Sequence, residues 1–207
     1  MASPRSWLEP AVVAGSLAPF VLLGARALGG TLGADPVAEL LNQLGLLTLV
    51  FLVASLACTP LKILLGWKWP IAVRRTLGLF AFFTACAHFL VYLVLDRELA
   101  LGAVVADVTE RPFVTVGFAA LVVLVPLAVT STKRALQRLG PRRWRWLHRL
   151  AYVAGVLGVV HYFIRVKKDT TEPLVYGAVL ALLFAVRIGD AVHKQLRRSA
   201  ARRRTLS

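Results

Sequence analysis

The sequence predicts an all-α, polytopic membrane protein with six transmembrane helices in one integral membrane domain that covers residues 1–207. Apolar residue types make up 58% of the chain and charged types only 17%, whereas soluble domains average about 45–50% and about 25%. The mean hydropathy is +0.71. Long uncharged runs recur along the chain and charged residues collect between them. This composition disfavours a soluble enzyme, a disordered chain and, with only two cysteines, a disulfide scaffold.

The first three spans are predicted at residues 10–28, 40–61 and 76–95. A bilayer core needs about 20 apolar residues per helix, and the second and third runs meet this length without one Asp, Glu, Lys or Arg. The first run has a shorter uncharged stretch, residues 11–25, and contains Pro19. It has no convincing signal-peptidase cleavage site, which consists of small residues, so we expect this run to remain as the first helix rather than to be a cleaved signal peptide.

The last three spans are predicted at residues 112–132, 147–165 and 173–189. The fourth run is uncharged throughout, whereas the fifth and sixth have uncharged stretches of only 15 and 13 residues. Flanking arginines extend such helices when their long side chains reach the headgroups. Buried helices of a soluble core are the alternative for short runs. Three full-length spans in the same chain disfavour that alternative.

The charged residues separate by side. Of the 25 Lys and Arg residues, 19 lie in the N-terminal tail and in residues 62–75, 133–149 and 187–204, while eight of the ten acidic residues lie in the other loops. Positively charged loops stay on the cytoplasmic side, so we expect both termini there, with residues 190–207 as a basic cytoplasmic tail. Anionic lipid headgroups account for this pattern. The net charge of +15 therefore does not indicate nucleic acid.

Histidines inside the spans are the candidate functional residues. His88 lies twelve residues into the third span and His161 eleven residues into the fifth uncharged stretch, so both imidazoles are expected at one depth. An ionisable residue deep in a span indicates function, and two facing histidines suit a haem iron. Zinc would need further ligands, for which the spans offer only Cys58 and Cys86. Hydrogen bonds between helices are the structural alternative.

His148 adds a third histidine at a different level. It precedes His161 by thirteen residues, which corresponds to about 20 Å along a helix and about 140° around it. The two rings therefore cannot point at one column on one face. Two redox sites, or one haem with another role for His148, both remain open. His193 in the basic tail is expected to be solvated.

Short motifs along most of the chain resemble one family. Each is weak alone, but their order and spacing are specific. The matching pieces are LGADPV at 32–37, TPL at 59–61, RRTLGL at 74–79, HFLVY at 88–92, RPFVTVG at 111–117, TSTKRALQRLG at 130–140, WLHRLAYV at 146–153, HY at 161–162 and PLVYGAVLALLFAVR at 173–187. The sequence thereby resembles the MsrQ (YedZ) family, haem-binding membrane subunits within the ferric reductase-like transmembrane superfamily.

The resemblance implies electron transfer across the bacterial inner membrane. It implies one or two b-type haems, bound at the iron by His88, His148 and His161, and an FMN. Quinol would supply electrons, which pass to MsrP, a periplasmic molybdenum-cofactor subunit that reduces methionine sulfoxide in oxidised proteins. Where the wider superfamily has a fourth ligand, this chain has Arg74 and Arg75. Guanidinium groups at these positions are suited to pair with haem propionates or a quinone headgroup; a role as positive charges flanking a span explains them equally well.

Other functions remain open at this stage. The sequence shows no Gly-rich phosphate loop after a strand, so a membrane quinol or a separate flavin reductase is expected to supply electrons. The spans show no nucleophile–base pair or carboxylate dyad, so we expect an electron-transfer subunit of an oxidoreductase without a substrate site of its own. A stand-alone ferric or cupric reductase, or another b-type cytochrome, is the closest alternative. A non-redox scaffold or transporter is the alternative from a different class.

Overall fold

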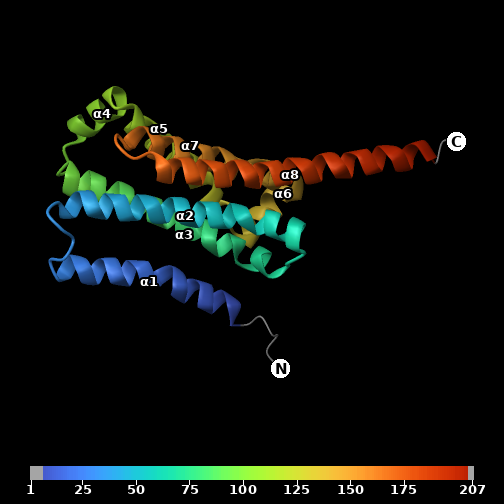
Figure 1. Ribbon diagram of the computed structural model, residues 1–207, viewed down its shortest axis with the longest axis horizontal. Helices are drawn as coiled ribbons and strands as arrows, with labels where there is room; N and C mark the ends of the chain where they lie inside the picture. The colour runs from blue at the N-terminus through green and yellow to red at the C-terminus, as the bar shows by residue number, and fades with distance from the viewer. Residues whose placement is uncertain (1–6, 205–207) are drawn as a thin grey trace.

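The structure, a computed structural model, describes residues 7–204, with side chains described through residue 200. That part of the chain contains helices only (Figure 1). Their bounds are α1 (Leu8–Leu28), α2 (Pro36–Leu65), α3 (Trp69–Val91), the π-helix η1 (Tyr92–Asp96), α4 (Leu101–Glu110), α5 (Pro112–Val129), α6 (Lys133–Leu147), α7 (Leu150–Arg165) and α8 (Thr171–Arg204). The predicted all-α class is confirmed.

Six segments account for the spans. Five are long and apolar enough to cross a membrane: α1, α2, α3 with η1, α5 and α8. The sixth is the pair α6 and α7, which is bent by 42° at the break between the two helices. The molecule is therefore a multi-pass membrane protein. Short connections make successive spans antiparallel, so the bundle has two ends, which we call the α4 end (residues 29–35, 97–111 and 166–170) and the α6 end (residues 66–68 and 130–149).

Helix α2 lies at the centre of the bundle. It packs against α3, α7 and α8, and α5 completes the group through α3 and α7. Leu56 of α2 is almost fully buried, and Ala81 of α3 and Ala154 of α7 are fully buried. Small residues at such crossings let membrane helices approach closely. Helix α1 packs mainly on α3 and lies to one side of the bundle (Figure 1).

Several segments differ from the sequence-based expectation. Residues 133–149 were expected as a basic loop, but residues 133–147 form α6, whose first turn is capped by the Thr132 side chain accepting from the Ala135 backbone N–H. Gly140, at φ +73°, provides the non-helical kink before Pro141. The fifth span was expected to begin at residue 147, whereas α7 begins at Leu150 after the bend. The short helix α4 was not expected.

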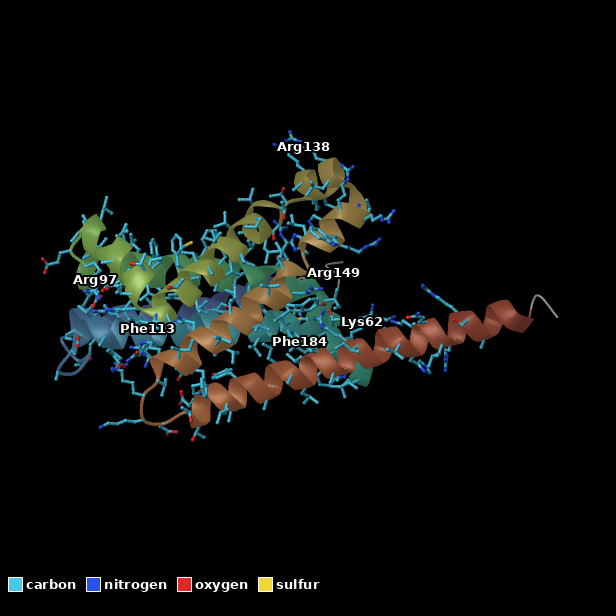
Figure 2. The ribbon with its side chains drawn as sticks, turned by 90° about the horizontal axis from the view of Figure 1, so that it is seen from above. Lys62, Arg97, Phe113, Arg138, Arg149 and Phe184 are labelled. Carbon is cyan, nitrogen blue, oxygen red and sulfur yellow. The ribbon has the colours of Figure 1, made fainter. Side chains whose placement is uncertain are left out.

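Helix α8 continues without a break through the region expected as a basic tail. Its 34 residues correspond to a rise of about 50 Å, compared with about 30 Å for a bilayer core. Figures 1 and 2 show its C-terminal part extending beyond the bundle. The side chains of residues 191–200, among them His193, are exposed.

A proline in α2 determines how α8 is attached near the α6 end. Pro60 has no backbone N–H, so the carbonyl of Leu56 lacks its usual helical donor. The Arg187 side chain of α8 supplies one, with Nη2 at 2.5 Å from the Leu56 oxygen, and its Nη1 donates to the Tyr152 hydroxyl of α7. The guanidinium also lies over the Tyr152 ring, 5.1 Å from its centroid. One arginine thus ties three helices together.

We expect Arg187→Met to lower the free energy of unfolding by about 1.5–3 kcal/mol, the usual value for hydrogen bonds from a charged group. In a Pro60→Ala background the residue-60 N–H can reach the Leu56 carbonyl, so the loss should be smaller by about 1 kcal/mol. Unfolding in mixed micelles with increasing SDS measures both. Lys194→Met is the control on the same helix, because its pair with Asp190 is an exposed i,i+4 contact. If Arg187→Met lowers the free energy of unfolding equally in wild type and in Pro60→Ala, then Arg187 does not compensate for Pro60.

Candidate functional site

A cavity of about 650 Å³ opens among α2, α3, α5 and α7 in the half of the bundle nearer the α4 end. This volume lies within the range of about 300–1,000 Å³ typical of cofactor pockets. Its lining is largely apolar, with Leu49, Leu52, Leu124 and Ala154 in the interior. Both His88 and His161 contribute to it.

The two imidazoles face each other across the helices. Their ring centroids are 6.2 Å apart and their planes are nearly perpendicular, at 86°. The expectation of a common depth is therefore confirmed. A bond from a metal to an imidazole nitrogen is about 2 Å long, so rings that bind one ion from opposite sides have centres roughly 6 Å apart. The observed separation fits this arrangement.

Each imidazole is oriented by a backbone carbonyl of a neighbouring helix. The distance from His88 Nδ1 to the Leu41 oxygen is 2.9 Å, and from His161 Nδ1 to the Phe113 oxygen 2.6 Å. Because a carbonyl only accepts, each Nδ1 must carry the proton and each Nε2 its lone pair. Within the described part of the chain, neither Nε2 has a hydrogen bond. Metal-binding histidines are oriented in the same way, with the nitrogen that does not bind the metal donating to a carbonyl or carboxylate.

Two glycines make room for the rings. A Cβ atom at Gly117 of α5 would lie 2.6 Å from His161 Nδ1, and one at Gly45 of α2 would lie 3.3 Å from His88 Cε1. Each imidazole thus rests against a helix backbone at a position where a side chain would displace it. The close approach of ring and backbone also brings the carbonyl acceptors within reach.

The donor set suits a porphyrin iron. Within the described residues, no group of three or more His, Cys, Asp and Glu side chains lies close enough to hold a metal ion by itself. Cys58 is buried and its Sγ donates to the Ala54 carbonyl, and Cys86 is half-buried. Two neutral imidazoles that face each other are the protein ligands a porphyrin iron would take, and the porphyrin would supply the other four nitrogens. The residues present therefore fit a haem between His88 and His161.

His148 lies apart from this pair, at the bend between α6 and α7. Its Nε2 is 3.1 Å from the Thr130 hydroxyl, and its ring stacks on Trp144 with centroids 3.8 Å apart. It does not line the cavity that contains the other two imidazoles. The Trp144 indole N–H in turn donates to the Thr130 carbonyl, at 2.9 Å. His148 thus belongs to a polar cluster at the α6 end.

Arg74 and Arg75 also lie toward the α6 end, away from the imidazole pair. The Arg74 Nη1 is 3.4 Å from the Thr59 hydroxyl of α2, and Arg74 acts electrostatically on both His148 and Arg187. Arg75 lines a separate groove of about 510 Å³ between α1 and α3. Neither arginine lines the cavity of His88 and His161.

Other arginines, which the sequence did not single out, surround the mouth of that cavity. Arg97, Arg111 and Arg165 all line it near the α4 end. Burial of Arg97 opposes its charge, but Tyr92, Asp96 and Asp107 more than offset this and hold its pKa above the ordinary value. The sequence offered one signal for these residues: Arg165 follows His161 by four residues, a spacing that places both on the same face of a helix. The glycine contacts had no local signal.

The fold and site define the chain as a helical membrane protein of the ferric reductase-like class. Residues 42–159, which include His88 and His148, match the family model described as ferric reductase like transmembrane component. His161 lies two residues beyond the matched region. The paired imidazoles between apolar helices are what this class would lead one to expect.

Curated relatives narrow the class. The chain is 51% identical over 185 residues to a protein of Rhodospirillum rubrum, covering 89% of each chain. It is 50% identical over 185 residues to one of Deinococcus radiodurans, with 89% and 91% covered, and 44% identical over 187 residues to one of Herminiimonas arsenicoxydans, with 89% and 86% covered. All three are named protein-methionine-sulfoxide reductase heme-binding subunit MsrQ. The chain belongs to the MsrQ family.

Proposed function

We propose that this protein is the haem b-binding, electron-transfer membrane subunit of a protein-methionine-sulfoxide reductase system. One observation carries the proposal: His88 and His161 face each other at 6.2 Å in a largely apolar cavity, each with its Nδ1 on a backbone carbonyl. The names of the relatives support both the haem and the reductase system. His88 and His161 are then the axial ligands of one haem.

The residues of the chain would prepare the site for this cofactor. A bound haem supplies one-electron redox chemistry at a potential that its axial ligands and surroundings adjust. The carbonyls of Leu41 and Phe113 keep both Nε2 lone pairs available. Leu49, Leu52 and Leu124 exclude water from the macrocycle.

The electron path extends the proposal to partners. Quinol, or a separate flavin reductase, donates the electrons, and a periplasmic molybdenum-cofactor subunit, MsrP, accepts them and reduces methionine sulfoxide in periplasmic proteins. The distribution of charge supports an inner-membrane location with the α6 end and both termini cytoplasmic. Lys62, Arg138 and Arg149 lie toward that end in Figure 2, and Arg97 and Phe113 toward the other. The helical arm of residues 190–204 would then lie on the cytoplasmic side of a single membrane domain.

A second redox site at the α6 end belongs to the same proposal. His148 is the imidazole available there, with Arg74 within electrostatic reach. Release of His148 Nε2 from the Thr130 hydroxyl would free a ligand. The protein would bind two haems per chain if a haem occupies this second site, and one if it does not. FMN is the second cofactor of the proposal. Arg74 and Arg75 would contact a quinone headgroup or the propionates of a haem at this second site, not those of the haem between His88 and His161.

The test is optical. We expect purified protein, expressed with ample haem supply, to show a b-type α-band in its dithionite-reduced minus oxidised spectrum. A pyridine haemochrome assay with the protein quantified alongside gives the haem per chain. A colourless protein would contradict the proposal and favour a scaffold or transporter. Reoxidation of the reduced protein by ferric chelates but not by the molybdenum subunit would instead favour a stand-alone metal reductase.

A further inference from the structure

The cavity of His88 and His161 has two chemically different ends. About two helical turns from the imidazoles toward the α6 end, it is closed by Leu52, Leu124 and Ala154. The opposite end of the lining is polar and charged, with Arg97, Arg111 and Arg165 beside Asp35, Asp96 and Glu172. A ligand that fits this cavity is therefore apolar at one edge and polar at the other.

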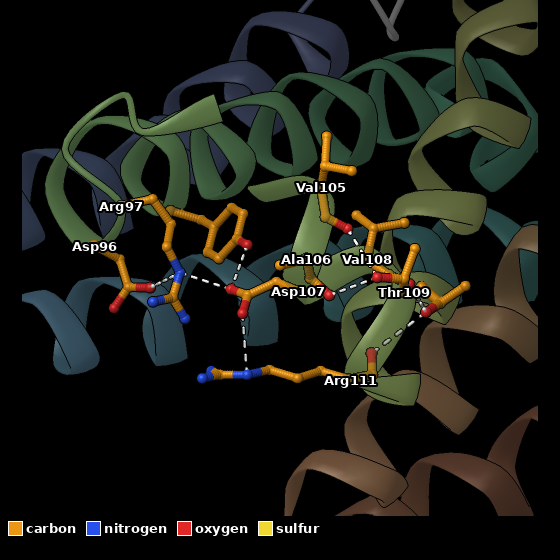
Figure 3. Close-up of polar contacts among 10 residues, drawn as sticks. Asp96, Arg97, Val105, Ala106, Asp107, Val108, Thr109 and Arg111 are labelled. Carbon is orange, nitrogen blue, oxygen red and sulfur yellow. Dashed lines mark hydrogen bonds and ion pairs between the residues drawn. The ribbon is translucent and has the colours of Figure 1, made fainter. Parts of the chain in front are cut away.

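Asp107 holds two of these arginines in place. Its side chain is only 9% exposed and comes from α4, where it lies between Arg97 and Arg111 (Figure 3). Asp107 Oδ2 is 2.6 Å from Arg97 Nε and accepts from the Tyr92 hydroxyl at 2.7 Å, while Oδ1 is 3.0 Å from Arg111 Nε. The π-helical turn η1 brings Tyr92 and Arg97 to this carboxylate.

The Nη1 and Nη2 atoms of Arg97 and Arg111 remain available to a ligand. Asp107 engages Arg97 and Arg111 through Nε, and Asp96 also approaches Arg97 at Nε, at 3.2 Å. Within the described part of the chain, no hydrogen bond engages the Nη atoms of either residue, and the carboxylates approach at Nε. These atoms are the fork that binds carboxylates with two parallel bonds.

Arg165 adds a third cation closer to the imidazoles. It follows His161 by one helical turn on α7, so the two side chains lie on one face. It lines the cavity, and it makes no ion pair or hydrogen bond with the described residues. A cation beside an apolar cavity without a protein counter-ion calls for an anionic ligand.

The acidic residues at the mouth already have partners. Besides Asp96, the cavity is lined by Asp35, which caps α2 through the Ala38 backbone N–H, and Glu172, which accepts from the Tyr162 hydroxyl at 2.5 Å. Neither carboxylate pairs with one of the three arginines. No carboxylate of the described residues therefore pairs with Arg165, and Asp35 and Glu172 leave Arg97 and Arg111 unpaired beyond their contacts with Asp96 and Asp107.

We propose that Arg97, Arg111 and Arg165 form a site for the two propionate carboxylates of the haem, with Asp107 and Tyr92 as positioning residues. This inference rests on the proposed function, because it assumes a porphyrin between His88 and His161. It fixes the orientation of the macrocycle: the propionate edge faces the α4 end, and the vinyl- and methyl-bearing edge faces Leu52, Leu124 and Ala154.

Esterified haem tests the proposal. Haem-depleted full-length protein in detergent is titrated with haemin and with haemin dimethyl ester, and both dissociation constants are read from the Soret band. The ester keeps the iron and the macrocycle but removes both negative charges. Because a hydrogen bond to a charged group is worth about 1.5–3 kcal/mol, we expect wild type to prefer the diacid by about tenfold or more.

Variants then assign this preference to residues. Arg165→Gln and Arg111→Gln should each reduce the diacid-to-ester preference severalfold while leaving the affinity for the ester near that of wild type. Asp107→Asn should reduce it as well, because both guanidinium groups lose their anchor. Arg138→Gln, an exposed arginine of α6 (Figure 2), is the matched control and should keep the wild-type preference.

The outcomes separate the inference from the proposed function. Equal affinity of wild type for the two forms, or a wild-type preference in both Arg165→Gln and Arg111→Gln, would overturn the propionate site while the haem function stands. If neither haemin nor haemin dimethyl ester binds, both the propionate site and the proposed haem function are overturned. Arg165→Gln removes no contact of the described fold, so its result is independent of folding defects at the Asp107 cluster.

Discussion

His88→Ala and His161→Ala should each lower the affinity for haem at least about 100-fold. Loss of even an outer-shell partner of a metal-binding histidine costs about 10–100-fold in affinity, and here the ligand itself is removed. The remaining imidazole cannot compensate, because it is held on its own carbonyl, Leu41 or Phe113. Haem per chain and the reduced-minus-oxidised spectrum measure the loss.

Two other histidines serve as controls for this experiment. His193 is exposed on the arm of α8, so His193→Ala should retain the wild-type spectrum. His148→Ala should leave the component of the His88–His161 pair intact and change a different component if a second haem is present. Full haem content in both His88→Ala and His161→Ala would remove the ligand assignment.

Gly117→Ala should damage the haem site with a change of one methyl group. The new Cβ would lie 2.6 Å from His161 Nδ1, so the ring must leave both the Phe113 carbonyl and its axial position. We expect a loss of haem affinity of about 10–100-fold. In the haem-free protein the gain of about 1 kcal/mol from alanine in a helix is offset by loss of the His161–Phe113 hydrogen bond, worth about 1 kcal/mol, so its stability should stay near that of wild type. Soret titration and thermal unfolding of the haem-free protein separate the two effects.

A graded series of glycine variants makes this prediction sharper. Gly45→Ala meets His88 at 3.3 Å and should cost less than Gly117→Ala. Gly24→Ala in α1 meets nothing within 4 Å and should leave haem affinity unchanged. If Gly117→Ala binds haem as tightly as wild type, the ring of His161 does not rest against the α5 backbone as described.

The spans could be predicted from the sequence because a bilayer imposes a simple rule. About 20 apolar residues are needed per crossing, and the uncharged runs at residues 40–61, 76–95 and 112–132 coincide with parts of α2, of α3 with η1, and of α5. The common depth of His88 and His161 followed from the same rule, since helical rise converts position in a span into depth.

The remaining features depend on contacts between distant residues. The ring of His88 meets the carbonyl of Leu41, 47 residues away, and that of His161 meets Phe113, 48 residues away. No local pattern encodes such pairs. Helices α4 and α6 were missed because their residues are mixed in polarity and flanked by Gly, Pro or acidic residues that are typical of loops. Asp107 appeared as one more loop acid, although its side chain is buried.

Pro60 of α2 and Arg187 of α8 are each unfavourable alone inside a membrane, and the attachment of α8 to α2 makes each compensate for the other. A carbonyl that proline deprives of its donor finds no water at membrane depth, and an arginine there is costly when it lacks acceptors. Leu56 and Arg187 satisfy one another. Replacement of Pro60 would therefore remove the reason for the arginine, and an apolar residue at position 187 would in turn make proline at position 60 unfavourable. We therefore expect an apolar residue at position 187 to be tolerated better when residue 60 is not proline.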